Sequence, residues 1–405
     1  MALITVRQGS AGYKAYLGIA WGLVVLGVLY IIFAHNLPGT IWSLDAGFRI
    51  SQVNDVLCYA VAILGLNLVI GYSGQLSLGQ SAFVGLGAYT TIILVADYHW
   101  SYIATIPVSA TLCFLVGLLV GLPALRIRGL YLAIVTLAVA YVFPTLVLKF
   151  ESLTGGPNGK KPERGEGVLK PPSWMPFADD GRISGPLWVF CILVVMSAVL
   201  FLVSRNYIKS RPGRALIALR DNQTSASVSG VNLPMYKSMA FGVSAAFGGL
   251  AGTMLMMNRP FASDVQFNLQ MAIFLVVGLV AGGAGTISGA FPGAFIYVFV
   301  PWYVAQWTLD QSGMPPGLRQ ITQPLFDWLE NRQGGDAISG VFFGVGLLVL
   351  VFLLPGGFIS GMRKLRARVI RVVPSPSWLS DVERDTGQVV EIVEPTEAPE
   401  ANVLT

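Results

Sequence analysis

The chain contains long stretches of apolar residues that carry no charged side chain. Stretches free of Asp, Glu, Lys and Arg include residues 17–34, 102–122, 130–148, 186–203 and 337–354. A helix of about 20 residues is long enough to cross the roughly 30 Å hydrocarbon layer of a bilayer. These stretches therefore predict a protein that is embedded in a membrane.

The composition of the whole chain supports this interpretation. Hydrophobic residues make up 54% of the chain and charged residues only 12%, whereas a soluble domain carries about 25% charged residues. We expect an all-α polytopic membrane protein with about ten transmembrane helices. The expected spans are residues 17–34, 53–71, 80–96, 102–122, 130–148, 186–203, 239–257, 269–285, 287–305 and 337–355. Glycine and polar residues interrupt the apolar sequence at 72–79 and 282–289, where the chain could turn back within the membrane.

The basic residues predict an orientation. With the N-terminus inside, more of the 26 Lys and Arg residues lie on inner than on outer segments. An even number of spans then places both termini in the cytoplasm. We expect a cytoplasmic N-terminal segment at 1–15, a transmembrane domain at 16–361 and a basic, then acidic, disordered tail at 362–405. Outer loops are expected at 149–185 and 306–336, the latter with a helix at 315–332 lying flat at the interface.

The sequence gives little support for catalysis or metal binding. It contains no H-E-x-x-H, no paired metal cysteines and no G-x-S-x-G. We therefore predict no catalytic residue, no metal site and no cofactor. Cys58, Cys113 and Cys191 fall within expected spans, so we expect free thiols.

The charge pattern indicates contact with lipid. The net charge of +5 comes from short basic clusters beside apolar runs, which favours a membrane surface over nucleic acid. Asp55, near the outer end of the expected span 53–71, is the only carboxylate within an expected span. An ion-coupled secondary transporter normally needs ionisable groups in its spans, and a membrane-embedded enzyme needs a cluster of reactive groups. Both are weaker alternatives.

Two glycine-rich segments, residues 71–77 and 282–288, resemble each other and occupy matching places between spans. Such interrupted segments in two halves of a chain point to a transport path. The candidates for lining that path are Gly74, Gln75, Ser77, Gln80, Ser81, Gly285 and Thr286. Many glycines are also spaced by four residues, which is typical of close helix packing. For Asn67 and Thr136, lone polar residues in spans, we expect interhelical hydrogen bonds.

The inner segment 205–237 is the most distinctive loop. Pro212 suits the first turn of a helix that we expect over 213–229, with Gly230 as its stop and a further helix starting at Pro234. Small residues on one side of that helix would let it dock in a groove of a partner protein. The alternative is an ordinary basic loop held by lipid phosphates.

These segments together resemble a known family. Residues 71–83 read Gly-Tyr-Ser-Gly-Gln-Leu-Ser-Leu-Gly-Gln-Ser-Ala-Phe, and they are followed by Gly87-Ala88-Tyr89. This is similar to the signature of the permease subunits of ATP-driven branched-chain amino acid importers, closer to the M-type permease than to its H-type partner. The Thr-Gly-Gly turn at 154–156, the loop at 213–241, the glycines of 281–293 and the turn at 354–357 resemble the same family.

The resemblance implies one half of a heterodimeric pore in the plasma (inner) membrane of a bacterium. The partners would be a second, H-type permease, two ATP-binding cassette subunits that hydrolyse ATP, and an extracytoplasmic solute-binding protein. The residues implied to couple this chain to the ATPase subunits are Arg214, Arg220, Asp221, Ala226, Gly230 and Asn232. The solute would be a branched-chain or other hydrophobic amino acid, with urea or a short amide as the alternative. The long outer loop at 160–176 and the acidic tail depart from the family pattern.

Overall fold

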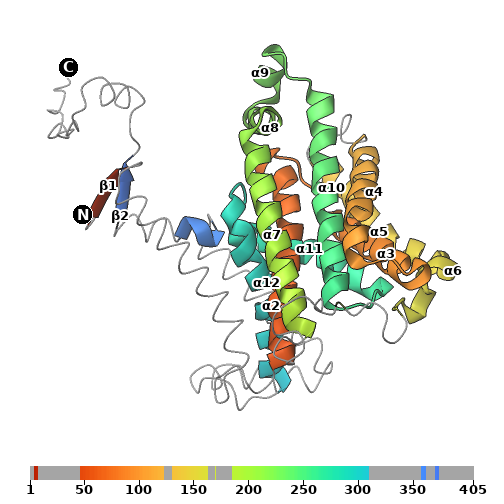
Figure 1. Cartoon of the computed structure of the whole chain (residues 1–405). Coiled ribbons are helices and arrows are strands. Elements are labelled where there is room, and N and C mark those ends of the chain that lie inside the picture. The colour runs from red at the N-terminus through yellow and green to blue at the C-terminus, as the bar shows by residue number, and fades with distance from the viewer. Residues whose placement is uncertain are drawn as a thin grey trace, which may run out of the picture. The chain divides into compact units, whose positions relative to one another are not determined.

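The structure is a computed structural model that describes residues 4–7, 46–122, 130–162, 169, 185–309, 357–361 and 370–373. The chain divides into two compact units, Met1–Ile31 with Met362–Thr405, and Ile32–Gly361. In the first unit, β1 (Ile4–Arg7) and β2 (Ile370–Val373) form a parallel pair with Ile4 opposite Ile370 (Figure 1). β2 lies within the segment 362–405 that we expected to be disordered, and its backbone pairs with a strand from the other end of the chain, while the expected domain bounds stay predictions.

The described residues of the second unit are mostly helical, with connecting segments and one isolated β-bridge between Lys160 and Ala262. Its first half consists of α2 (Ala46–Asn67), η1 (Leu68–Tyr72), α3 (Gln80–Tyr98), α4 (Tyr102–Gly121), α5 (Leu130–Lys149), α6 (Glu151–Thr154) and η3 (Gly156–Asn158). Its second half consists of α7 (Gly185–Lys209), α8 (Arg211–Asp221), α9 (Gln223–Val228), α10 (Leu233–Asn258), η4 (Asp264–Phe267), α11 (Leu269–Gly282), η5 (Ile287–Gly289) and α12 (Ala290–Leu309).

Six helices among the described residues are long and apolar enough to cross a membrane. They are Ile50–Tyr72, Gln80–Tyr98, Tyr102–Gly121, Tyr131–Lys149, Leu187–Lys209 and Leu233–Asn258. Leu269–Gly282 and Ile287–Trp302 are shorter apolar helices. The prediction of a polytopic α-helical membrane protein is confirmed, while the number of ten spans and the side of the termini stay predictions. The expected spans 17–34 and 337–355 and the flat helix 315–332 lie outside the described residues.

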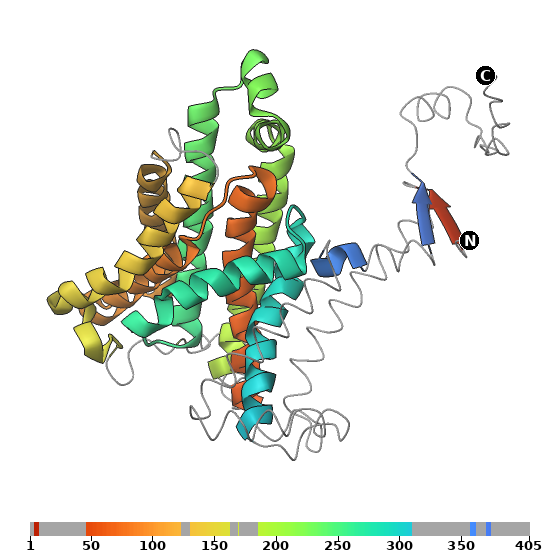
Figure 2. The same cartoon turned by 180° about the vertical axis from the view of Figure 1, so that it is seen from behind.

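Two helices form the centre of the bundle. The apolar windows of α2 and α10 are each 83% buried, whereas those of α4, α5 and α7 are 22%, 28% and 33% buried. α10 packs against α2, α3 and α4, and α2 also packs against α7, α11 and α12 (Figures 1 and 2). A helix that is apolar on all sides needs either protein or lipid around it. The sparsely buried helices therefore have apolar outer faces that lipid or another protein must cover.

Local sequence explains where several helices begin. The side chains of Ser101, Asn232 and Asn268 accept hydrogen bonds from backbone N–H groups in the first turns of α4, α10 and α11. Such caps satisfy N–H groups that have no partner inside the helix. Pro212 and Pro234 stand in the first turns of α8 and α10, as predicted.

The spaced glycines allow helix backbones to touch. A Cβ atom at Gly87 of α3 would overlap the Gly249 carbonyl of α10, and one at Gly252 would overlap the Val84 carbonyl. Between α11 and α12, a Cβ at Gly282 would overlap the Gly289 carbonyl in the same way. The packing interpretation of these glycines is confirmed, because small residues at a helix interface permit close approach.

Two expectations about helix boundaries need correction. The expected helix 213–229 is two helices, because Asn222 adopts an extended conformation and its side chain accepts from the N–H groups of Thr224 and Ser225, starting α9 anew. The expected span 269–285 ends early, at Gly282, because Gly283 and Gly285 have positive φ angles of 116° and 77°.

Gly87→Val tests the contact between α3 and α10. The added side chain has no space against the Gly249 carbonyl, so the helices must separate, at a cost of about 1–3 kcal/mol or more. We expect a lower melting temperature and a lower yield of monodisperse protein in detergent. Ala198→Val, on the exposed side of α7, is the control and should melt like the wild type. Equal melting of both variants would contradict the close packing.

Candidate functional site

The two glycine-rich segments that resemble each other in sequence lie against each other in the structure. The first follows α2 through the π-helical turn η1, and the second joins α11 to η5 and α12. The buried side chain of Asn67 links them: its Nδ2 donates to the Thr286 carbonyl and its Oδ1 accepts from the Gly285 N–H, each at 2.8 Å. Asn67 is hydrogen-bonded across the bundle as expected, and its partners are backbone groups of the turn between α11 and η5.

Glycine is required on both sides of this contact. A Cβ at Gly71 would overlap Oδ1 of Asn67 and lie only 2.5 Å from the Gly285 nitrogen. Gly285 itself has a φ of 77°, a conformation that residues with a side chain rarely adopt. The two turns can therefore approach this closely only because neither position carries a side chain.

Arg220 joins α8 to the same place. Its Nη1 donates to the Gly71 carbonyl at 2.6 Å. Its side chain also lies against Gly74, where a Cβ would be 3.1 Å from the Arg220 Cγ, and against Gly285, where a Cβ would be 3.0 Å from Nη1. We call Asn67, Gly71, Arg220, Gly285 and Thr286 the glycine junction.

α8 is anchored beside the glycine junction by its apolar face. Leu216 and Leu219 of α8 belong to one buried cluster with Val69 of η1, and with Phe241 of α10. Leu132 of α5 completes the contact between the helices. α8 therefore rests directly on the π-helical turn, and Arg220 is the polar part of an extensive contact.

The predicted path residues are buried in this conformation. Gln75 donates from Nε2 to the Ser73 hydroxyl at 2.9 Å, and Ser77 and Ser81 are also buried. Among the described residues, Oε1 of Gln75 and Oγ of Ser81 are buried without a hydrogen-bond partner. Unpaired buried polar atoms are costly, so these two are the atoms most able to gain from contact with a polar solute. Their role in a path stays a prediction.

Gln80, by contrast, is engaged by the protein. Its Nε2 donates to the carbonyls of Ala62 in α2 and Ser244 in α10, and its Oε1 accepts from the Ser244 hydroxyl at 3.2 Å. This side chain joins three helices at a point where it is 1% exposed. The Thr136 hydroxyl of α5 accepts from the Leu78 N–H at 2.9 Å, so its hydrogen bond joins a helix to the extended segment before α3 and does not join two helices as expected.

The six residues implied to couple the chain to an ATPase occupy different environments. Arg214 is exposed and donates to the Lys209 carbonyl, Asp221 and Gly230 are exposed, and Asn232 caps α10. Gly230 has a φ of 81° directly after α9, which suits its expected role as a stop. Ala226 is 4% exposed and belongs to the apolar cluster under α8. Ala226 therefore packs against its own chain in this conformation, and its role in coupling to an ATPase stays a prediction.

An exposed residue that the sequence analysis overlooked lies at the tip of α9. Val228 is 84% exposed, which is unusual for an apolar residue in the loop between two spans. α9 is also tied to α10 through Lys237, whose Nζ donates to the Gln223 side chain at 3.1 Å. The tip is therefore held in place while Val228 stays accessible. Nothing in the sequence distinguishes this valine from a core residue, because its exposure follows from the position of α9 in the fold.

The opposite end of the bundle carries ion pairs. Asp55 of α2 pairs with Arg259 and accepts from Asn258 Nδ2 at 2.8 Å. Asp97, at the end of α3, pairs with Lys160, whose backbone bridges to Ala262. Asp55 and Asp97 are the carboxylates of the candidate spans among the described residues, and each has a cationic partner.

A large apolar groove lies between α3, α4 and α5. It encloses about 840 Å³, and its walls come from side chains such as Phe83, Leu112, Val139 and Phe143. None of the predicted path residues lines it. Among the described residues there is no group of three or more His, Cys, Asp or Glu side chains that could hold a metal ion. All three cysteines are free thiols, as predicted.

These features define the class: a polytopic α-helical membrane protein whose interrupted helices meet under an exposed helix pair. A family model described as "Branched-chain amino acid transport system / permease component" matches residues 50–330. The chain belongs to this family, which confirms the resemblance seen in the sequence.

Two curated proteins are similar to the chain over part of its length. It is 33% identical over 246 residues to the high-affinity branched-chain amino acid transport system permease protein LivM of Escherichia coli (strain K12), with 57% of each chain covered. The same identity and coverage apply to LivM of Salmonella typhimurium (strain LT2). The chain thus spans 57% of the length of the curated relatives it matches. No solved structure gives a significant match.

Gln80→Leu tests whether Gln80 holds the helices together. The change leaves the Ser244 hydroxyl and two carbonyls without their buried partner, so we expect a loss of about 1–3 kcal/mol. The measurement is thermal unfolding of the purified protein. Thr111→Val, which removes an exposed hydroxyl bonded within its own helix, should be nearly neutral. Wild-type stability combined with lost uptake would assign Gln80 to the solute path instead.

Proposed function

We propose that this chain is a permease subunit of an ATP-driven importer of branched-chain amino acids in a bacterial inner membrane. Its partners would be a second permease, two ATP-binding cassette subunits and an extracytoplasmic solute-binding protein. Membership of the family and the names of the two relatives support this proposal. The observation that carries it is the helix pair α8–α9, exposed at its tip, whose Arg220 donates a hydrogen bond to the first glycine-rich turn and lies against the second.

The arrangement of charges favours energy supplied by partner subunits over an ion-coupled mechanism. Asp55 and Asp97 both lie at the end opposite α8 and are paired with cations. A carboxylate that carries protons or ions across the membrane needs access along its path. Among the described spans no such group lies at the middle of the bundle. Energy would then reach the spans through the end that carries α8 and α9, which we place on the cytoplasmic side.

The proposal is tested by co-purifying the full chain with its partner subunits and measuring uptake into proteoliposomes. We expect leucine uptake that requires both ATP and the solute-binding protein, with urea transported far less. Urea uptake in place of leucine would identify the amide-transporting alternative. Leucine uptake driven by an ion gradient without ATP hydrolysis would contradict the proposal.

Val228→Asp tests the tip of α9 as the ATPase contact. Burying an unpaired carboxylate in an interface is strongly unfavourable, so we expect the affinity for the ATPase subunits to fall by about tenfold or more. The measurement is titration of the purified permease with ATPase subunits. Val265→Asp, at a valine that is 70% exposed at the opposite end, is the matched control. Equal affinity in both variants would exclude the tip from the interface.

Cysteine labelling tests the solute path. Gln75→Cys and Ser77→Cys, in a background without the three native cysteines, replace residues that are 6% and 3% exposed. We expect them to resist polar thiol reagents at rest and to react during ATP turnover, because the path must open to water. Protection under both conditions would show that these residues only pack against their neighbours.

A further inference from the structure

We propose that Arg220 is the positioning residue that makes α8 and the two glycine-rich turns move as one body. This inference rests on the proposed function and adds to it the contact through which movement of α8 would reach the spans. The hydrogen bond to Gly71 and the close approach to Gly74 and Gly285 carry it.

The position of Arg220 suits a cation. Gly71 lies in η1, at the C-terminal end of the long helix that begins as α2, and Gly285 lies just beyond the C-terminal end of α11. The last carbonyls of a helix have no partner within it and carry a partial negative charge. The guanidinium group offers several N–H donors in a fixed fork and stays charged. One side chain from α8 therefore bonds to the end of the α2–η1 helix and lies beside the end of α11.

The contacts around Arg220 leave little room for independent movement. Asn67 bonds to both the Gly285 N–H and the Thr286 carbonyl, so the second turn is attached to the end of α2. A Cβ at Gly71 would lie only 2.5 Å from the Gly285 nitrogen, which shows how closely the turns fit. If α8 shifts, it must carry both turns with it or break its bond to the Gly71 carbonyl.

The π-helical turn η1 is the element whose conformation can change. π-helices are rare, and most are single turns that occur at functional sites. Their hydrogen bonds span one residue more than those of an α-helix. Here the five residues Leu68–Tyr72 lie between Asn67 and the extended segment that leads to α3. Val69 of this turn packs in the same cluster as Leu216 and Leu219 of α8. Movement of α8 would therefore act on the least regular turn of the central helix.

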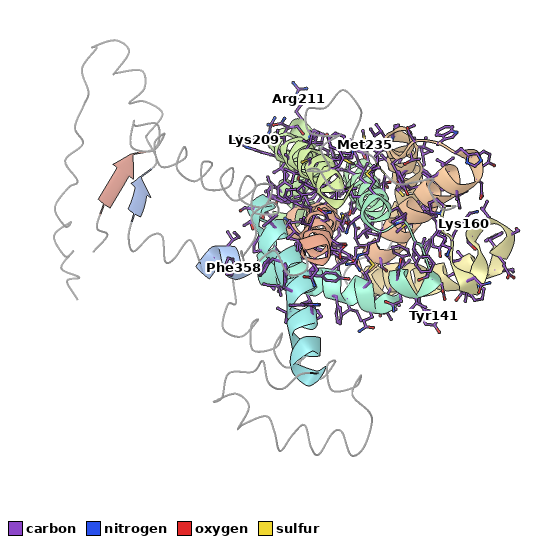
Figure 3. All side chains as sticks on the ribbon, turned by 60° about the horizontal axis from the view of Figure 1, so that its bottom comes forward. Tyr141, Lys160, Lys209, Arg211, Met235 and Phe358 are labelled. Carbon is purple, nitrogen blue, oxygen red and sulfur yellow. The ribbon has the colours of Figure 1, made fainter. Side chains whose placement is uncertain are left out.

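Arg220→Met in the complete complex is the first test. We expect the variant to bind the ATPase subunits and hydrolyse ATP like the wild type, while leucine uptake per ATP falls by about tenfold or more. Arg211→Met is the matched control, because Arg211 lies on the same helix, is exposed, and points away from the helices in Figure 3. It loses the same charge and should keep wild-type uptake.

The outcomes separate this inference from the proposed function. If the wild-type complex shows no ATP-dependent uptake, the proposed function fails. If the wild type transports and Arg220→Met transports equally well, only the positioning role of Arg220 is overturned. Loss of ATPase binding in Arg220→Met would also overturn it, since Arg220 would then be a docking contact.

A disulfide gives a second, reversible test. A Cβ at Gly74 would lie 3.5 Å from the Arg220 Cβ, within the range that a disulfide spans. In a background without the native cysteines, Gly74→Cys combined with Arg220→Cys should be uncoupled when reduced. Oxidation should restore uptake, because a covalent bond then replaces the guanidinium contact. Because Gly74 has a φ of 69°, Gly74→Cys alone is the control for strain. Uptake that stays low after disulfide formation while Gly74→Cys alone transports, or uptake that stays high after reduction, would contradict the inference.

Discussion

Helix ends in a membrane protein leave backbone N–H and C=O groups that must find partners within the protein, since the bilayer core supplies no water. In this chain several helices end at the glycine junction, and side chains form hydrogen bonds to backbone groups at these helix ends. Asn67 serves the Gly285 N–H and the Thr286 carbonyl, and Arg220 serves the Gly71 carbonyl. The interrupted helices depend on these few bonds. The same bonds connect the exposed helix pair α8–α9 to the spans, so stability and proposed coupling share one structural basis.

Close packing of glycine-bearing helices provides the rest of the framework. Helices gain little from the hydrophobic effect when they associate within lipid, so contact between backbones and hydrogen bonds must hold them together. Gly87 and Gly252 bring α3 and α10 together, and Thr91 and Thr253 join their hydroxyls at 2.8 Å in the same interface. The packing of α3 against the central helix α10 follows from these contacts. The exposed faces of α4, α5 and α7 remain for lipid or for partner subunits.

Much of the fold could be predicted because its signals are local. Apolar length predicts the spans, Pro212 and Pro234 mark helix starts, and Gly230 marks a stop. The lone polar residues Asn67 and Thr136 predicted hydrogen bonds to other parts of the chain, because an amide or hydroxyl in an apolar span needs a partner. Local signals also failed where two of them competed. At Asn222 the capping side chain ended one helix and began another, which the surrounding helix-forming residues concealed.

The sequence by itself determined that this chain is a membrane-embedded helical protein, where most of its helices lie and which family it resembles, because apolar length, capping residues and glycine motifs act over short distances. Only the tertiary structure decided which polar residues meet. Arg220 and Gly71 are 149 positions apart, and nothing in the spacing of the chain shows that they touch. It also decided that Gln80 joins helices, that Ala226 is buried and that Val228 is exposed. These outcomes depend on how helices pack against one another, and packing is a property of the whole bundle.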